Sequence, residues 1–318
     1  MTIVRRPLLI AVMGSGLMLG ALVHHRVSAQ GEARGSVTGA GNPTPAPSVV
    51  PLSPKATPKA TVTLTQRDRT TLQRTFKALS DRRDFPDQIQ QVAEQFLAVP
   101  YQADMLDRAE PEVLTLSLQK FDCVLFVESV LAIARAGDDR SEAGFVARMQ
   151  AQRYRGGVID GYCSRLHYFS DWIGDNQQRG LVEDLTPRLG GVTFKPRLDF
   201  MSQHWQKYPR LVGNSNNRDC VDRMETTLAS QPRTYLPTAS IAQHYDQLQS
   251  GDIVAIATAV PGLDTTHVGL LYRSASGGVG IIHAAPRSGV KVSRDLQSFV
   301  EQVDQAIGIM VARPSIGP

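Results

Sequence analysis

The chain has 318 residues, of which 42% are hydrophobic and 20% are charged, a composition typical of a soluble globular protein with one catalytic domain. Its formal net charge is +4, but Arg5, Arg6 and Arg26 lie in an N-terminal segment without acids, so the remainder carries only +4 − 3 = +1. A charge this small argues against nucleic-acid binding.

The N-terminal 63 residues have the pattern of an export signal and a linker. A pair of arginines precedes the apolar stretch 7–23, and small residues at 27–29 offer a cleavage site, so residues 1–29 are expected to be a secretory signal peptide. An uncleaved membrane anchor is the alternative. Residues 30–63 are rich in Pro, Ser, Thr and Ala and predict a disordered linker. We therefore expect an exported protein of the periplasm or cell envelope, with its catalytic domain at 64–318.

Helices are expected in the first part of this domain, at about 64–248. Polar capping residues followed by apolar residues at helical spacing predict helices that begin after Thr65, Asp122 and Ser141. Two more are expected after Pro86 and from Ser164 to Gln178. The alternating run 113–118 fits either a strand or extended chain.

The pattern changes at about residue 249, where short apolar runs alternate with Gly- and Pro-containing turns. The expected strands and the helix among them cover residues 252–258, 267–273, 278–283, 290–292, 293–303 (the helix) and 306–312. Helices followed by strands predict an α+β fold, in which a helical lobe packs on a C-terminal antiparallel sheet or small barrel at about 249–318.

Three residues suggest the chemistry of a cysteine hydrolase. Cys123 falls in the first turn of an apolar helix, where the positive end of the helix favours a thiolate. His267 and His283 lie on predicted strands and could act as a base and as the group that orients it. Asp252 and Asp264 remain alternatives for the orienting group.

The chain contains three cysteines, so at least one cannot pair within the chain. Cys163 and Cys220 could form a disulfide that leaves Cys123 reduced, or both could be buried thiols.

The order and spacing of several motifs resemble those of the NlpC-type papain-like cell-wall cysteine hydrolases, and most closely their N-acetylmuramoyl-L-alanine amidase-like branch. The resemblance covers most of 65–314. It is carried by Pro100-Tyr101, Phe121-Asp122-Cys123, Ser164-Arg165-Leu166-His167-Tyr168-Phe169, Gly251-Asp252-Ile253-Val254, Pro261-Gly262-Leu263-Asp264, His267-Val268-Gly269 and Ile282-His283-Ala284.

The resemblance implies a papain-like fold and a role for each matching residue. Cys123 would be the nucleophile, His267 its general base and later acid, and His283 the residue that orients His267. Tyr101 would bind the substrate carbonyl or its oxyanion, and Asp122 matches the acidic residue before the cysteine.

The resemblance also implies a peptidoglycan substrate. In related peptidases a serine follows the cysteine and helps to hold a free peptide amine, but Val124 stands here. This difference favours cleavage of the amide between N-acetylmuramic acid and L-alanine over cleavage by a γ-D-glutamyl-diamino acid endopeptidase. Arg165 and His167 could line a groove, although a solvated helix face is the alternative.

We expect a monomer that uses no cofactor and no metal. Two other classes remain open. Cys123, His267 and His283 could bind zinc, although their spacing is not that of a compact zinc motif. The protein could also be a wall-binding module whose thiol is catalytically silent.

Overall fold

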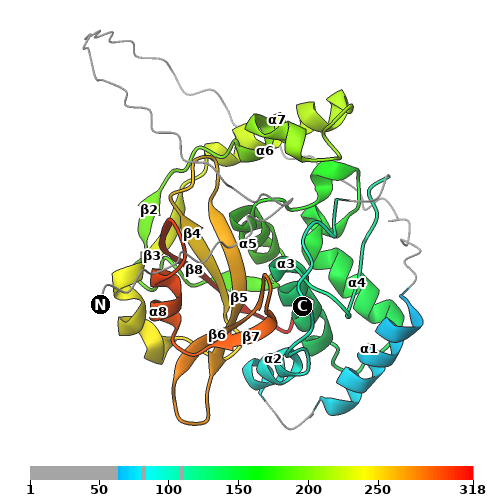
Figure 1. Cartoon of the computed structure of the whole chain (residues 1–318), viewed down its shortest axis with the longest axis vertical. Helices are drawn as coiled ribbons and strands as arrows, with labels where there is room; N and C mark the ends of the chain where they lie inside the picture. The colour runs from blue at the N-terminus through cyan, green and yellow to red at the C-terminus, as the bar shows by residue number, and fades with distance from the viewer. Residues whose placement is uncertain (1–63, 80–83, 108–110, 318) are drawn as a thin grey trace, which may run out of the picture. The chain divides into compact units, whose positions relative to one another are not determined.

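The computed structural model describes residues 64–79, 84–107 and 111–317, which belong to one compact unit (Figure 1). The predicted signal peptide at 1–29 and linker at 30–63 lie outside the described residues. No helix in the described ranges is long and apolar enough to cross a membrane.

Five helices precede most of the sheet, and their predicted caps are confirmed. Thr65, Asp122 and Ser141 each accept a hydrogen bond from a backbone amide in the first turn of the helix that follows. The helices are α1 (Gln66–Ala78), α2 (Phe85–Glu94), α3 (Cys123–Ala134), α4 (Glu142–Arg153) and α5 (Phe169–Gln178).

The helix predicted to begin at Ser164 begins at Phe169 instead. Ser164 ends a short 3₁₀ helix, Tyr162–Ser164. The chain then leaves the helical path because Arg165 forms an antiparallel bridge with Tyr154, in which the amide of Leu166 donates to the carbonyl oxygen of Arg153. The alternating run 113–118 lies outside the sheet.

The strands form one antiparallel sheet in the order β2-β3-β8-β4-β5-β6-β7, with β1 also paired to β8. The strands predicted after residue 249 are confirmed. They are β4 (Ile253–Thr258), β5 (Thr265–Arg273), β6 (Val279–Ala285), β7 (Gly289–Ser293) and β8 (Ala306–Pro314), with α8 (Leu296–Glu301) before the last one.

The predicted division into a helical lobe and a β-rich lobe is too simple. Three strands from the supposedly helical part join the same sheet through β8: β1 (Val182–Asp184), β2 (Val192–Phe194) and β3 (Arg233–Pro237). Three further segments were not predicted: α6 (Phe200–Gln203), α7 (Ser215–Ala229) and a 3₁₀ segment at Thr238–Gln247. Strands β1–β3 are too short, and too poor in alternating apolar residues, to give a clear periodic signal in the sequence.

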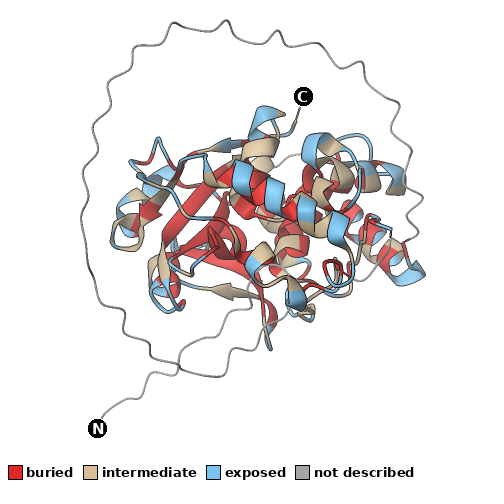
Figure 2. Cartoon of the chain, turned by 90° about the horizontal axis from the view of Figure 1, so that it is seen from above, coloured by how far each residue is buried: buried red, intermediate tan, exposed pale blue. Residues whose placement is uncertain are grey.

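The central strands β4, β5 and β6 are buried along almost their whole length, and buried residues (red) dominate the strands in Figure 2. One face packs with α1–α5 in a core that includes Cys123, Val268 and Leu270. The other face packs with α8 in a second core that includes Leu271 and Ile281. Because side chains alternate along a strand, odd-numbered residues of β6, and of β5 from His267 onward, face α8, and even-numbered residues there face α3.

Candidate active site

Cys123 is the first residue of α3 and is 4% exposed. The amide of Leu125 donates to Oδ1 of Asp122 at 2.7 Å, so Asp122 caps the helix directly beside the thiol. The backbone amide of Val268 on β5 lies near enough to the thiol to lower its pKa, against the larger effect of burial. The thiol therefore lies one residue along the strand from His267.

The thiol reaches β5 where β5 and β6 separate. Their paired register ends at Leu270 opposite Ile282. Leu271 exchanges its backbone bonds with Gly251 and Asp252, just before β4, so by alternation the amides of even-numbered residues point toward β6. The amide of Val268 lies beyond the last paired residue, and this leaves it available to the sulfur.

The two predicted histidines meet at the same place, where β5 and β6 separate. Nε2 of His267 lies 2.7 Å from Nδ1 of His283, and Nε2 of His283 lies 3.0 Å from Oγ of Ser293. Both rings are on the α8 face, with the imidazole of His283 4.7 Å from the ring of Phe299, centroid to centroid. Cys123 approaches from the α3 face. Within the described residues, no hydrogen bond joins its sulfur directly to His267.

The two carboxylates considered as alternatives to His283 have other partners. Asp252 accepts two hydrogen bonds of 2.8 Å from Arg313, and Asp264 accepts the amides of Ser170 and Thr265 at 2.8 and 2.7 Å. Their roles are to hold strand ends and a helix start in place.

Burial keeps the thiol and both imidazoles neutral. Desolvation, followed by the charge of Asp122, raises the pKa of Cys123 to about 12 and outweighs the lowering by backbone amides. The thiolate expected from the helix end is therefore not the resting form. Burial also lowers the pKa of His267 to about 3 and that of His283 to about 2.

Tyr101 lies beside the nucleophile because backbone hydrogen bonds hold residues 98–102 both to Phe121 and to β7. Residues flanking Tyr101 exchange backbone hydrogen bonds with Phe121, two residues before the cysteine. The segment also bonds to β7 and passes so near Gly289 that a Cβ there would lie 2.3 Å from the carbonyl oxygen of Val99. Burial, then the charges of Cys123 and Asp122, raises the pKa of Tyr101, so its hydroxyl keeps the proton that it could donate.

Arg165 and His167 do not form a solvated helix face. Arg165 is 6% exposed and is ion-paired with Asp107 and, at 3.2 Å, with Glu112. Nε2 of His167 contacts the carbonyl oxygen of Tyr162 at 2.9 Å. Both residues therefore contribute to a polar network behind Asp122. Burial raises the pKa of Asp122, and the charge of Arg165 partly opposes this effect.

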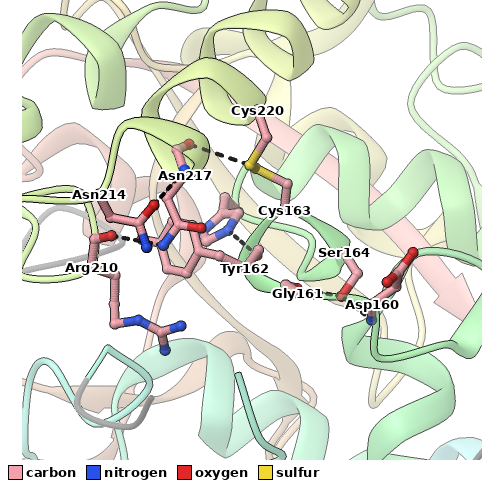
Figure 3. The surroundings of a disulfide bond; sticks show 10 residues. Asp160, Gly161, Tyr162, Cys163, Ser164, Arg210, Asn214, Asn217 and Cys220 are labelled. Carbon is pink, nitrogen blue, oxygen red and sulfur yellow. Dashed lines mark hydrogen bonds between the residues drawn. A yellow bond between two sulfur atoms is a disulfide. The ribbon is translucent and has the colours of Figure 1, made fainter. Parts of the chain in front are cut away.

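Cys163 and Cys220 form a disulfide, which leaves Cys123 as the free thiol (Figure 3). The disulfide ties the turn before Arg165 to α7, a connection between segments 57 residues apart. Figure 3 shows this turn, with Asp160, Gly161 and Ser164, on the opposite side of the disulfide from the start of α7.

Two features of the site escaped the sequence analysis. Ser293 was assigned to the start of a helix but ends β7, where it is the diagonal neighbour of His283. The role of the Val268 amide could not be predicted, because a backbone group leaves no side-chain signal in the sequence.

As for the zinc alternative, the described ranges contain no group of three or more His, Cys, Asp or Glu residues placed to hold a metal ion.

Residues 91–309 match the family model AmiA-like, N-acetylmuramoyl-L-alanine amidase-like. The chain belongs to this family of amidase-like peptidoglycan hydrolases. No curated protein matches the chain.

The chain is also similar to several solved structures. An N-acetylmuramoyl-L-alanine amidase from Bacteroides uniformis is 32% identical, with a TM-score of 0.70 over 73% of this chain and 99% of that one. A Bacteroides fragilis protein described as a candidate xylanase is 34% identical, with a TM-score of 0.64 over 70% and 98%. A Legionella pneumophila protein at 18% identity shares the fold, with a TM-score of 0.60 over 78% and 94%.

Proposed function

We propose that this protein is an exported cysteine amidase of peptidoglycan that cleaves the bond between N-acetylmuramic acid and L-alanine. The observation that carries the proposal is the meeting of three groups where β5 and β6 separate: the imidazoles of His267 and His283 at 2.7 Å, and the thiol of Cys123, whose pKa the amide next to His267 lowers. The amidase-like family supplies the substrate class.

The contacts between the rings permit the tautomers that such a reaction requires. When Nε2 of His283 donates to Ser293, its Nδ1 can accept a hydrogen bond from Nε2 of His267. The remaining nitrogen of His267, Nδ1, is then unprotonated and can act as a base. In this form His283 and Ser293 are positioning residues.

The neutral resting state defines the order of proton movements. His267 would take the thiol proton as the sulfur attacks the amide carbonyl, because a thiol whose pKa is about 12 is not ionised beforehand. The tetrahedral oxyanion would receive a hydrogen bond from the hydroxyl of Tyr101. His267 would then protonate the nitrogen of L-alanine as the C–N bond breaks, and water would release the lactyl acid from the thioester.

A digest of purified peptidoglycan tests this proposal. The wild-type chain should release intact stem peptides that begin with L-alanine, identified by mass, and Cys123→Ala should release none. An endopeptidase would leave L-alanine and D-glutamate on the glycan. Undiminished release by a folded Cys123→Ala variant would remove the thiol from the reaction.

Chelation separates the thiol mechanism from the zinc alternative. Treatment with EDTA should leave stem-peptide release by the wild-type chain unchanged, since the proposed reaction uses no metal. A loss of release that added zinc restores would instead favour a metal site.

A further inference from the structure

A groove of about 690 Å³ lies at the end of the sheet where β4 ends and β5 begins. It is lined by residues 194–197, 199, 203–204, 258–263 and 307, and we call it the β4–β5 groove. None of these residues has a role in the proposed reaction.

The groove lies on the same side of the sheet as the thiol and close to the histidines. Phe194 and Ile307, which line it, pack against the core cluster that contains Cys123. Thr258, on its rim, is two residues beyond Ile256, the register partner of His267. At about 3.3 Å per strand residue, the rim is roughly 7 Å along the sheet from His267.

The two walls of the groove are bonded to each other. The amides of Asp199 and Phe200 donate to the carbonyl oxygen of Gly262 at 3.3 and 3.2 Å. Gly262 has a φ of +85°, and a Cβ there would lie 2.9 Å from the Phe200 nitrogen, so the approach requires glycine. The next helix residue, Met201, donates its amide to the buried Glu225 at 2.9 Å. The groove is therefore formed before any ligand enters.

The charged side chains that line the groove, Lys195, Arg197 and Asp199, carry a net positive charge. Lys195 is exposed and has no ion pair or hydrogen bond within the described part of the chain. Arg197 is 80% exposed and pairs with Asp199 at 2.6 Å. Nδ1 of His204 contacts a backbone carbonyl at 2.8 Å and must carry a proton to donate to it, so in the neutral ring Nε2 can accept a hydrogen bond.

We propose that the β4–β5 groove binds the stem peptide of the substrate, with Lys195 and Arg197 receiving its carboxylates and Nε2 of His204 accepting one of its N–H groups. This inference rests on the proposed function. The lactyl carboxyl group is consumed in the scissile amide, so the carboxylates of this substrate lie on the peptide side. Two or three peptide residues at up to about 3.5 Å each span the distance from the reacting carbonyl to the groove.

Calorimetric titration tests this assignment. The probe is the tripeptide L-Ala-γ-D-Glu-diamino acid, titrated into the full chain carrying Cys123→Ala. We expect Lys195→Gln and Arg197→Gln each to weaken binding about two- to fivefold, as for exposed charge pairs, and the double variant about tenfold. The matched control Lys207→Gln removes an exposed lysine outside the groove and should leave binding unchanged.

Two outcomes would overturn the assignment. In the first, the double variant binds the tripeptide as tightly as the Lys207→Gln control does. In the second, a tripeptide whose carboxylates are amidated binds as tightly as the unmodified tripeptide. Failure of the proposed function has a different signature. In that case the tripeptide would still bind in a Lys195-dependent manner, but the wild-type chain would release no stem peptides from peptidoglycan. If both hold, groove variants should raise KM for muropeptides and leave kcat unchanged.

Discussion

Replacement of Asp122 by asparagine should make the Cys123 thiol more reactive without weakening α3. The carboxylate of Asp122 is the largest charge effect that raises the pKa of Cys123. It also caps the helix through the amide of Leu125 at 2.7 Å. Asparagine is as good an N-cap as aspartate, so Asp122→Asn removes the charge and keeps the cap.

The expected magnitude follows from the interaction of two neighbouring charges. At roughly 6 Å and an effective dielectric constant of about 20, the repulsion is about 3 kcal/mol, or up to about two pKa units of the thiol. The thiolate fraction at a fixed pH then rises up to about 100-fold. Because nucleophilicity falls with pKa, the net gain in alkylation rate is up to about tenfold.

Iodoacetamide alkylation measures this change directly, because Cys163 and Cys220 are paired and Cys123 is the free thiol. Burial raises the pKa of Asp122 to about 6, so the carboxylate is ionised at pH 8 and largely protonated at pH 5. The wild type and Asp122→Asn should therefore differ at pH 8 and converge at pH 5.

The control Asp122→Ala also removes the charge but loses the cap, and should lower the free energy of unfolding by about 0.5–2 kcal/mol. Equal alkylation rates of wild type and Asp122→Asn at pH 8 would refute the electrostatic reasoning.

Two further predictions concern the groups that support the site. Replacement of His283 by alanine should lower kcat by about 10²- to 10⁴-fold with KM unchanged, because His267 loses its 2.7 Å partner, while Ser293→Ala should lower it only about fivefold. A His283→Ala variant with normal kcat and pH profile would exclude a positioning role. The paired substitutions Cys163→Ser and Cys220→Ser open a loop with a sequence separation of 57, and should lower the free energy of unfolding by about 4 kcal/mol in urea denaturation with activity at 25 °C retained. Lost activity at unchanged stability would instead indicate a direct role for the disulfide in the site.

Local signals in the sequence were enough for the helices near the nucleophile and for the strands that carry the histidines. Capping side chains such as Asp122 act on amides within three residues, and the apolar runs of β4–β6 are buried on both faces. The same local signals failed at residues 164–168, where the amide of Leu166 donates to the carbonyl oxygen of Arg153 instead of to a helical partner.

By itself, the sequence determined which residue types could react and the order of the elements that carry them. Only the tertiary structure decided that Val268 on β5 lies near the Cys123 thiol, that Ser293 contacts His283, and that β1–β3 extend the sheet. It also decided the protonation state: a helix end favours a thiolate, but burial raises the pKa of Cys123 to about 12. Desolvation depends on everything packed around a group, and no local pattern of residues encodes it.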